Sequence, residues 1–175
     1  MLAAILAALV LAGTDQFIKY LIVQDFALGE SRQFLAIGGK RLVDLTYVLN
    51  DGAAFSSMAG KRILLIAVPC LLLVFCIWLL RKYGRESRFV SIALAMIMGG
   101  GLGNLYDRIF NHGKVIDYLE WKPFQFAIFN FADCLICVGC ALVFLYFLFA
   151  DDKKKPKAEA EAIPQATEAG ETSHD

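Results

Sequence analysis

The chain has 175 residues, of which 58% are hydrophobic and 19% charged, with 17 basic and 17 acidic side chains. The hydrophobic share exceeds the roughly 45–50% of an ordinary soluble domain. This composition excludes a typical water-soluble globule and favours a membrane protein. The Lys and Arg residues form short clusters beside apolar runs, not one basic face with interleaved aromatic side chains. We therefore expect no nucleic-acid partner.

Four apolar segments approach the roughly 20 residues that cross a hydrocarbon core. They are Met1–Val23, Ile63–Leu80, Phe89–Leu105 and Phe126–Ala150. The pattern predicts an α-helical integral membrane protein with four transmembrane helices in one domain, residues 1–150. The first segment has no basic residues before it, so we expect a retained helix and not a secretory signal. Residues 151–175, biased towards Ala, Glu and Lys, are expected to form a disordered cytoplasmic tail.

Basic residues in short loops predict the orientation of the helices, because such loops stay on the cytoplasmic side. One cluster follows the second segment and another follows the fourth: Arg81, Lys82, Arg85 and Arg88, then Lys153, Lys154, Lys155 and Lys157. Both termini are therefore expected in the cytoplasm, and residues 24–61 and 106–125 outside.

The outer loop 24–61 carries signals for a small extracytoplasmic β element. Phe34–Ile37 and Arg41–Leu49 are rich in strand-forming residues and are separated by Gly38-Gly39, which predicts a hairpin. Asn50-Asp51-Gly52 then predicts a turn. Ala53–Ala59, a short apolar stretch, is expected to form a short helical flap.

Polar residues inside or beside the spans are the most informative, because ionisable groups at membrane depth are costly and usually mark function. The first and third helices run outwards and the fourth runs inwards, so their polar residues meet in one layer at the outer interface. Asp15 and Lys19, spaced i, i+4, share one helix face and can neutralise each other. The layer consists of Asp15, Lys19, Asn104, Asp107, Arg108, Asp117, Asn130 and Asp133.

Two carboxylates in a partly dehydrated pocket share a proton, so one acts as a base and the other as an acid. Such a pair can hydrolyse a peptide bond with water. Spacing leaves Asp15, Asp107, Asp117 and Asp133 all open as members of the pair. A proton-coupled carrier is the main alternative, but it needs polar groups that continue to the cytoplasmic side, where the last three helices have almost none. A non-catalytic scaffold, in which the polar layer only locks the helices together, is a third interpretation.

Two further patterns favour packing over chemistry. Cys134, Cys137 and Cys140 have a spacing like that of iron–sulfur ligands, but small polarisable side chains along one helix face also pack well without metal. Gly99 and Gly103, four residues apart, suit close contact between helices.

Four sequence blocks, in chain order and on the predicted elements, carry a resemblance to a known family. They are Thr14-Asp15-Gln16 with Lys19; Asn50-Asp51-Gly52-Ala53-Ala54-Phe55-Ser56; Gly103-Asn104-Leu105-Tyr106-Asp107-Arg108 through Val115-Ile116-Asp117-Tyr118; and Phe129-Asn130-Phe131-Ala132-Asp133. The sequence resembles the bacterial lipoprotein signal peptidases, or signal peptidases II, which are aspartic peptidases of the inner membrane.

The resemblance implies that Asp117 and Asp133 form the catalytic dyad. It implies that nine further residues shape or stabilise the pocket: Asp15, Lys19, Asn50, Gly52, Asn104, Asp107, Arg108, Asn130 and Ala132. It also implies prolipoprotein substrates, cut on the amino side of a diacylglyceryl-modified Cys, with no metal or organic cofactor. We expect a monomer in membrane lipid, with its active site near the periplasmic face.

Overall fold

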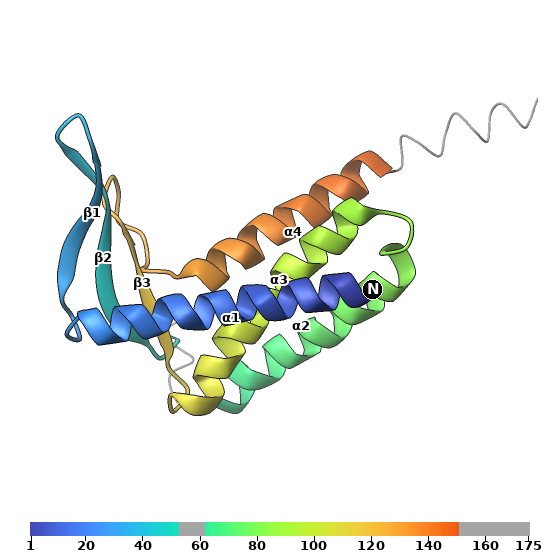
Figure 1. The fold of residues 1–175 in the computed structure, drawn as a ribbon, viewed down its shortest axis with the longest axis horizontal. Coiled ribbons are helices and arrows are strands. Elements are labelled where there is room, and N and C mark those ends of the chain that lie inside the picture. The colour runs from blue at the N-terminus through green and yellow to red at the C-terminus, as the bar shows by residue number, and fades with distance from the viewer. Residues whose placement is uncertain (53–61, 151–175) are drawn as a thin grey trace, which may run out of the picture.

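Four long helices form a bundle that carries a small sheet at one end (Figure 1). In the computed structural model, which describes residues 1–52 and 62–150, the helices are α1 (Leu2–Asp25), α2 (Arg62–Tyr83), α3 (Arg88–Phe110) and α4 (Phe131–Ala150). Each is long and apolar enough to cross a membrane. The predicted four-helix membrane fold is confirmed. The predicted flap 53–59 and tail 151–175 lie outside the described residues.

Helix α3 is the centre of the bundle and packs against each of the other three helices. Its most apolar stretch is 67% buried, against 17–22% in α1, α2 and α4, whose outer faces expose large apolar side chains as lipid would require. Glycines of α3 allow α1 and α4 to approach it closely. A Cβ at Gly99 would touch Leu11 of α1, and one at Gly100 would overlap the Ala132 carbonyl of α4. The predicted role of glycines in helix contact is confirmed at Gly99.

The sheet has three antiparallel strands, β1 (Ser31–Ile37), β2 (Lys40–Asn50) and β3 (Val115–Trp121), in that spatial order. The predicted hairpin is confirmed. Its turn is Gly38-Gly39, where φ is 58° and 76°, a backbone conformation that glycine adopts without steric cost. A small apolar cluster of Ile22, Ile116 and Tyr118 joins the sheet to the helices.

The structure adds detail to the chain around Asp117 and corrects one prediction about the chain around Asp133. Residues 106–125, predicted to lie outside, contain the end of α3 and the strand β3, whose Asp117 is aligned with Val48 of β2. The fourth helix begins at Phe131 and not at Phe126, because Phe129 still pairs with Leu119 of β3. Asp133 therefore lies in the first turn of α4, at the sheet end of the bundle.

Candidate functional site

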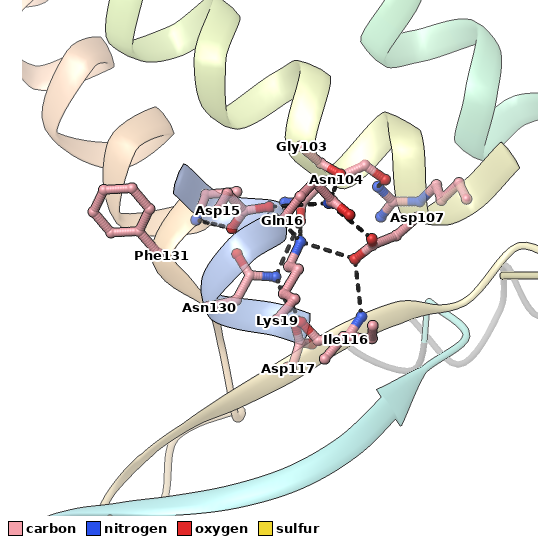
Figure 2. Close-up of polar contacts among 12 residues, drawn as sticks. Asp15, Gln16, Lys19, Gly103, Asn104, Asp107, Ile116, Asp117, Asn130 and Phe131 are labelled. Atoms are coloured by element: carbon pink, nitrogen blue, oxygen red, sulfur yellow. Dashed lines mark hydrogen bonds and ion pairs between the residues drawn. The ribbon is translucent and has the colours of Figure 1, made fainter. Parts of the chain in front are cut away.

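A buried lysine binds two buried carboxylates where α1 meets α3 (Figure 2). The Lys19 Nζ lies 2.8 Å from Asp15 Oδ2 and 2.8 Å from Asp107 Oδ2, and it donates a hydrogen bond of 3.0 Å to Asn104 Oδ1. Lys19 is 1% exposed and both carboxylates are 0% exposed. The predicted neutralisation of Asp15 by Lys19 is confirmed, with Asp107 as a second partner that the sequence pattern did not assign.

The same cluster connects both helices to the sheet and to α4. Asp107 Oδ2 accepts a 3.1 Å hydrogen bond from the Ile116 N–H of β3, and Asp15 Oδ1 accepts one of 3.1 Å from the Ala132 N–H. The first N–H groups of a helix have no partner within it, so Asp15 also caps α4. Gln16 spans α1 and α3 by donating to the Gly103 carbonyl and to Asp107 Oδ1, each at 3.0 Å.

A single buried amide, Asn130, connects Asp117 to Asp133. Its Nδ2 donates to Asp117 Oδ1 at 2.6 Å, and its Oδ1 accepts from the Asp133 N–H at 2.9 Å. Asp133 Oδ2 accepts in return from the Asn130 N–H at 3.1 Å, a reciprocal arrangement typical of a helix amino terminus. Asn104 completes the group by donating to Asp133 Oδ1 at 2.7 Å. Asn130, directly before α4, thus holds Asp117 of β3 and Asp133 of α4 together, and α3 holds Asp133 through Asn104.

Asp117 is almost fully buried, with 2% of its surface exposed. Burial raises its pKa to about 6, and the charge of Asp133 acts in the same direction, while the hydrogen bond from Asn50 opposes the rise. That hydrogen bond, from Asn50 Nδ2 to Asp117 Oδ2, is 2.8 Å long. Asn50 Oδ1 also accepts from the Gly52 N–H at 2.9 Å, and Gly52 makes this turn with a φ of 98°, where glycine is favoured.

Asp117 and Asp133 both line a cavity of about 650 Å³ between α2, α4 and the sheet. Polar groups line one part of it, including the Arg108 side chain, whose Nη1 lies 3.5 Å from the Asn104 carbonyl. The rest of the wall is mostly apolar and comes from α2, from the segment that precedes α4, and from α4 itself: Leu64, Leu65, Val68, Pro69, Phe126, Ala127, Ile128, Phe129, Cys134 and Cys137. A mostly apolar wall with a few convergent polar groups is typical of a ligand-binding site.

The eleven residues singled out from the sequence all lie in this connected region: Asp15, Lys19, Asn50, Gly52, Asn104, Asp107, Arg108, Asp117, Asn130, Ala132 and Asp133. Two roles were missed. Gln16 was given no role, although its polarity on an apolar helix next to Asp15 was a signal. Tyr118 was also missed; its hydroxyl accepts from the Phe131 N–H at 3.2 Å, a contact without a sequence signal.

Comparison with known families identifies this arrangement. The family model for signal peptidase (SPase) II matches residues 7–149. The chain belongs to the signal peptidase II family. The lipoprotein signal peptidase of Enterococcus faecalis is 36% identical over 148 residues, which cover 85% of this chain and 88% of that protein. That of Desulfitobacterium hafniense is 39% identical over 145 residues, covering 83% and 91% of the two chains.

A solved structure extends the likeness to the fold. A bacterial membrane enzyme has a TM-score of 0.74 to this chain at 27% identity, over 85% of this chain and 94% of that one. The matched region includes every candidate site residue, because the signal peptidase II family model runs from residue 7 to residue 149. The buried network and the cavity beside it therefore belong to the family portion of the chain.

Proposed function

We propose that this chain is an aspartic endopeptidase that removes signal peptides from prolipoproteins. It cuts on the amino side of a diacylglyceryl-modified Cys, and Asp117 and Asp133 activate the attacking water. The observation that carries the proposal is that these two carboxylates share one hydrogen-bonding amide, Asn130, and line the same cavity. Membership of the signal peptidase II family and the lipoprotein signal peptidases among its relatives support the substrate class.

The chemistry needs one proton between the two carboxyl groups. Asp117, whose pKa burial raises to about 6, holds that proton. The Asp133 carboxylate takes a proton from water, the resulting hydroxide attacks the scissile carbonyl carbon, and Asp117 gives its proton to the carbonyl oxygen. The tetrahedral intermediate then loses the amine: the C–N bond breaks, the nitrogen receives a proton from Asp133, and Asp117 recovers its own. Water is the only co-reactant.

Arg108 and the Asn104 side chain keep this site polar on the α3 side. The guanidinium of Arg108 lines the cavity together with Asp117 and Asp133, so it limits the net negative charge that the two carboxyl groups create. Asn104 donates to Asp133 while accepting from Lys19 and Asn130. These groups position the aspartates before substrate arrives, which lowers the reorganisation that catalysis requires.

The apolar part of the cavity suits the lipid half of the substrate. Acyl chains can remain among α2, α4 and the surrounding lipid, while the peptide enters the polar part beside the sheet. The basic clusters near residues 81–88 and 153–157 support an orientation in the inner membrane with both termini of residues 1–175 in the cytoplasm and the sheet end near the periplasmic face. Residues 1–150 form the peptidase domain, which acts as a monomer in membrane lipid.

The test compares Asp117→Asn and Asp133→Asn with Asp25→Asn in detergent micelles. Asp25 is exposed at the end of α1, so it provides the same chemical change outside the site. A diacylglyceryl-modified precursor and its unlipidated form are incubated with each protein and separated by gel shift. We expect the wild type and Asp25→Asn to cut only the lipidated precursor, and both site variants to lose cleavage by at least about a hundredfold. Cleavage that persists in both site variants would remove the dyad.

The distribution of buried polar groups argues against a carrier, and the same Asn variants test the scaffold. A carrier would need a path across the bundle, yet within residues 1–52 and 62–149 the buried charged and amide groups gather at the sheet end. A scaffold predicts that the Asn variants lose thermal stability together with any activity. We expect instead that cleavage is lost while the unfolding temperature is retained.

A further inference from the structure

The segment that precedes α4 continues the sheet without being one of its three strands. Phe129 donates its N–H to the Leu119 carbonyl at 3.1 Å, and its carbonyl accepts from the N–H groups of Leu119 and Tyr118 at 2.8 and 3.0 Å. Both main-chain groups of Phe129 therefore point towards β3. The pairing is a single isolated antiparallel bridge, so the Phe126–Phe129 segment meets the open edge of β3 at Phe129.

The neighbouring residue has the opposite orientation. Main-chain groups of successive residues in an antiparallel strand point alternately towards and away from a given partner. Because those of Phe129 point to β3, the N–H and C=O of Ile128 point away from β3. Ile128 lines the cavity that Asp117 and Asp133 also line. Within the described residues, no hydrogen bond is assigned to the Ile128 main chain.

An unpaired main-chain edge in a largely apolar cavity is a binding feature. A backbone N–H or C=O without a partner costs free energy when water is displaced, so a bound ligand gains by pairing with it. Extended peptides bind exposed sheet edges in this way, and the hydrogen bonds depend little on side-chain identity. The edge leads along the chain from Phe126 through Asn130 to Asp133, so a strand laid against it reaches the dyad.

We infer that the Phe126–Phe129 segment binds the extended peptide next to the scissile bond as an added β-strand, through the N–H and C=O of Ile128. This inference rests on the proposed function. The Phe126–Phe129 segment sets the path of the substrate and recognises the geometry of its main chain. Alternate residues of the bound peptide turn their main-chain groups towards Ile128 and Phe126, and the residues between them turn away.

The experiment removes single N–H groups from the substrate. The wild-type enzyme is given synthetic lipopeptides that end in a diacylglyceryl-modified Cys segment, with one backbone amide at a time replaced by an ester at the four residues that precede the Cys. An ester removes the donor without adding bulk, and the unmodified lipopeptide is the reference. We expect kcat/KM to fall about fivefold or more at alternate residues, the value of one lost hydrogen bond, and less than about twofold between them.

A matched pair of enzyme variants tests the protein side. Ile128→Pro removes the N–H, whereas Ile128→Ala shortens the same side chain and keeps the donor. We expect the kcat/KM of Ile128→Pro to be about fivefold or more below that of Ile128→Ala. Thermal unfolding of both variants checks that they are folded, and the ester series decides the question on wild-type enzyme if Ile128→Pro is not.

The outcomes are distinct. If kcat/KM falls at alternate ester positions, the added strand is supported. If kcat/KM changes equally at all four positions while the reference lipopeptide is cut, the added strand is overturned and the proposed function stands. If the reference lipopeptide is not cut at all, the proposed function fails, and the added strand fails with it.

Discussion

Replacing Lys19 with Met should destabilise the protein more than any other single change to a charged residue in the bundle. The substitution keeps the volume of the side chain but leaves two carboxylates, Asp15 and Asp107, without the ammonium that lies 2.8 Å from each. All three groups are at most 1% exposed, so water cannot take its place. Removing one member of a buried ion pair costs roughly 3–5 kcal/mol.

The loss is measured by thermal unfolding in detergent micelles, followed by tryptophan fluorescence. For a protein of 150–250 residues, each kcal/mol lowers Tm by about 2–4 °C, so Lys19→Met should lower Tm by roughly 6–20 °C. Lys40→Met, an exposed lysine at the start of β2, is the matched control and should change Tm little. Adding Asp15→Asn to Lys19→Met removes one of the two repelling charges while keeping the oxygen that accepts from Ala132, so the double variant should recover part of the loss.

Two results would refute this reasoning. If Lys19→Met lowered the free energy of unfolding by less than about 1 kcal/mol, the buried ion pairs of Lys19 would contribute no more than an exposed salt bridge. A double variant less stable than Lys19→Met alone would mean that the two carboxylates do not repel each other in the folded protein.

Three other predictions concern the neighbouring groups. Because the pKa of Asp117 is about 6 and the proposed mechanism uses its proton, kcat/KM should fall as pH rises through about 6. The midpoint of the kcat profile should lie at a higher pH, because bound substrate excludes water from Asp117. A rate that rises across this range would contradict the role of Asp117 as the proton donor. The folded protein also holds the Asp117 proton more tightly than the unfolded chain does, so the stability that this proton contributes is lost as pH rises from 3.8 towards 6. At pH 8, Asp117→Asn should therefore unfold at the same temperature as wild type or at a higher one. Gly103→Ala would push a Cβ into the Asp15 carboxylate and should cost roughly 1–3 kcal/mol in denaturant unfolding, whereas Gly101→Ala meets only Leu73 at 3.6 Å and should be close to neutral.

The sequence was sufficient to predict the elements that depend on local composition. Long apolar runs identify four helices because a membrane requires a fixed span, and Gly38-Gly39 identifies the hairpin because few other residues adopt its backbone angles. The polar layer could also be placed, since helix direction alone brings the outer ends of α1, α3 and α4 together. These predictions needed no knowledge of which side chains touch.

Elements that depend on distant partners were beyond local reasoning. Strand β3 pairs with β2, more than sixty residues earlier in the chain. Val115, Ile116, Tyr118 and Trp121 favour a strand, but the run itself does not identify the partner that it pairs with. The apolar residues from Phe126 to Phe129 have the hydropathy of a helix, but the bridge to Leu119 keeps them with the sheet.

The candidate site shows the same division between composition and contact. Sequence spacing left four aspartates as possible members of a catalytic pair. In the structure, Asp15 and Asp107 bind Lys19, whereas Asp117 and Asp133 bind Asn130 and line the cavity. The difference arises from the positions of Lys19 and Asn130, which meet at Asn104 and become neighbours only once α1, α3 and α4 are packed.

The position of Asn130 at the start of α4 has a consequence for how the enzyme matures during synthesis. Among the four described spans α4 is made last. Asn130, directly before it, supplies the amide that holds Asp117, and the first turn of α4 supplies Asp133. A nascent chain that has inserted only its first three helices therefore has one of the aspartates missing and the other unrestrained. Under the proposed mechanism, cleavage therefore requires that α4 has packed, so a molecule without α4 cannot cut neighbouring membrane proteins by this route.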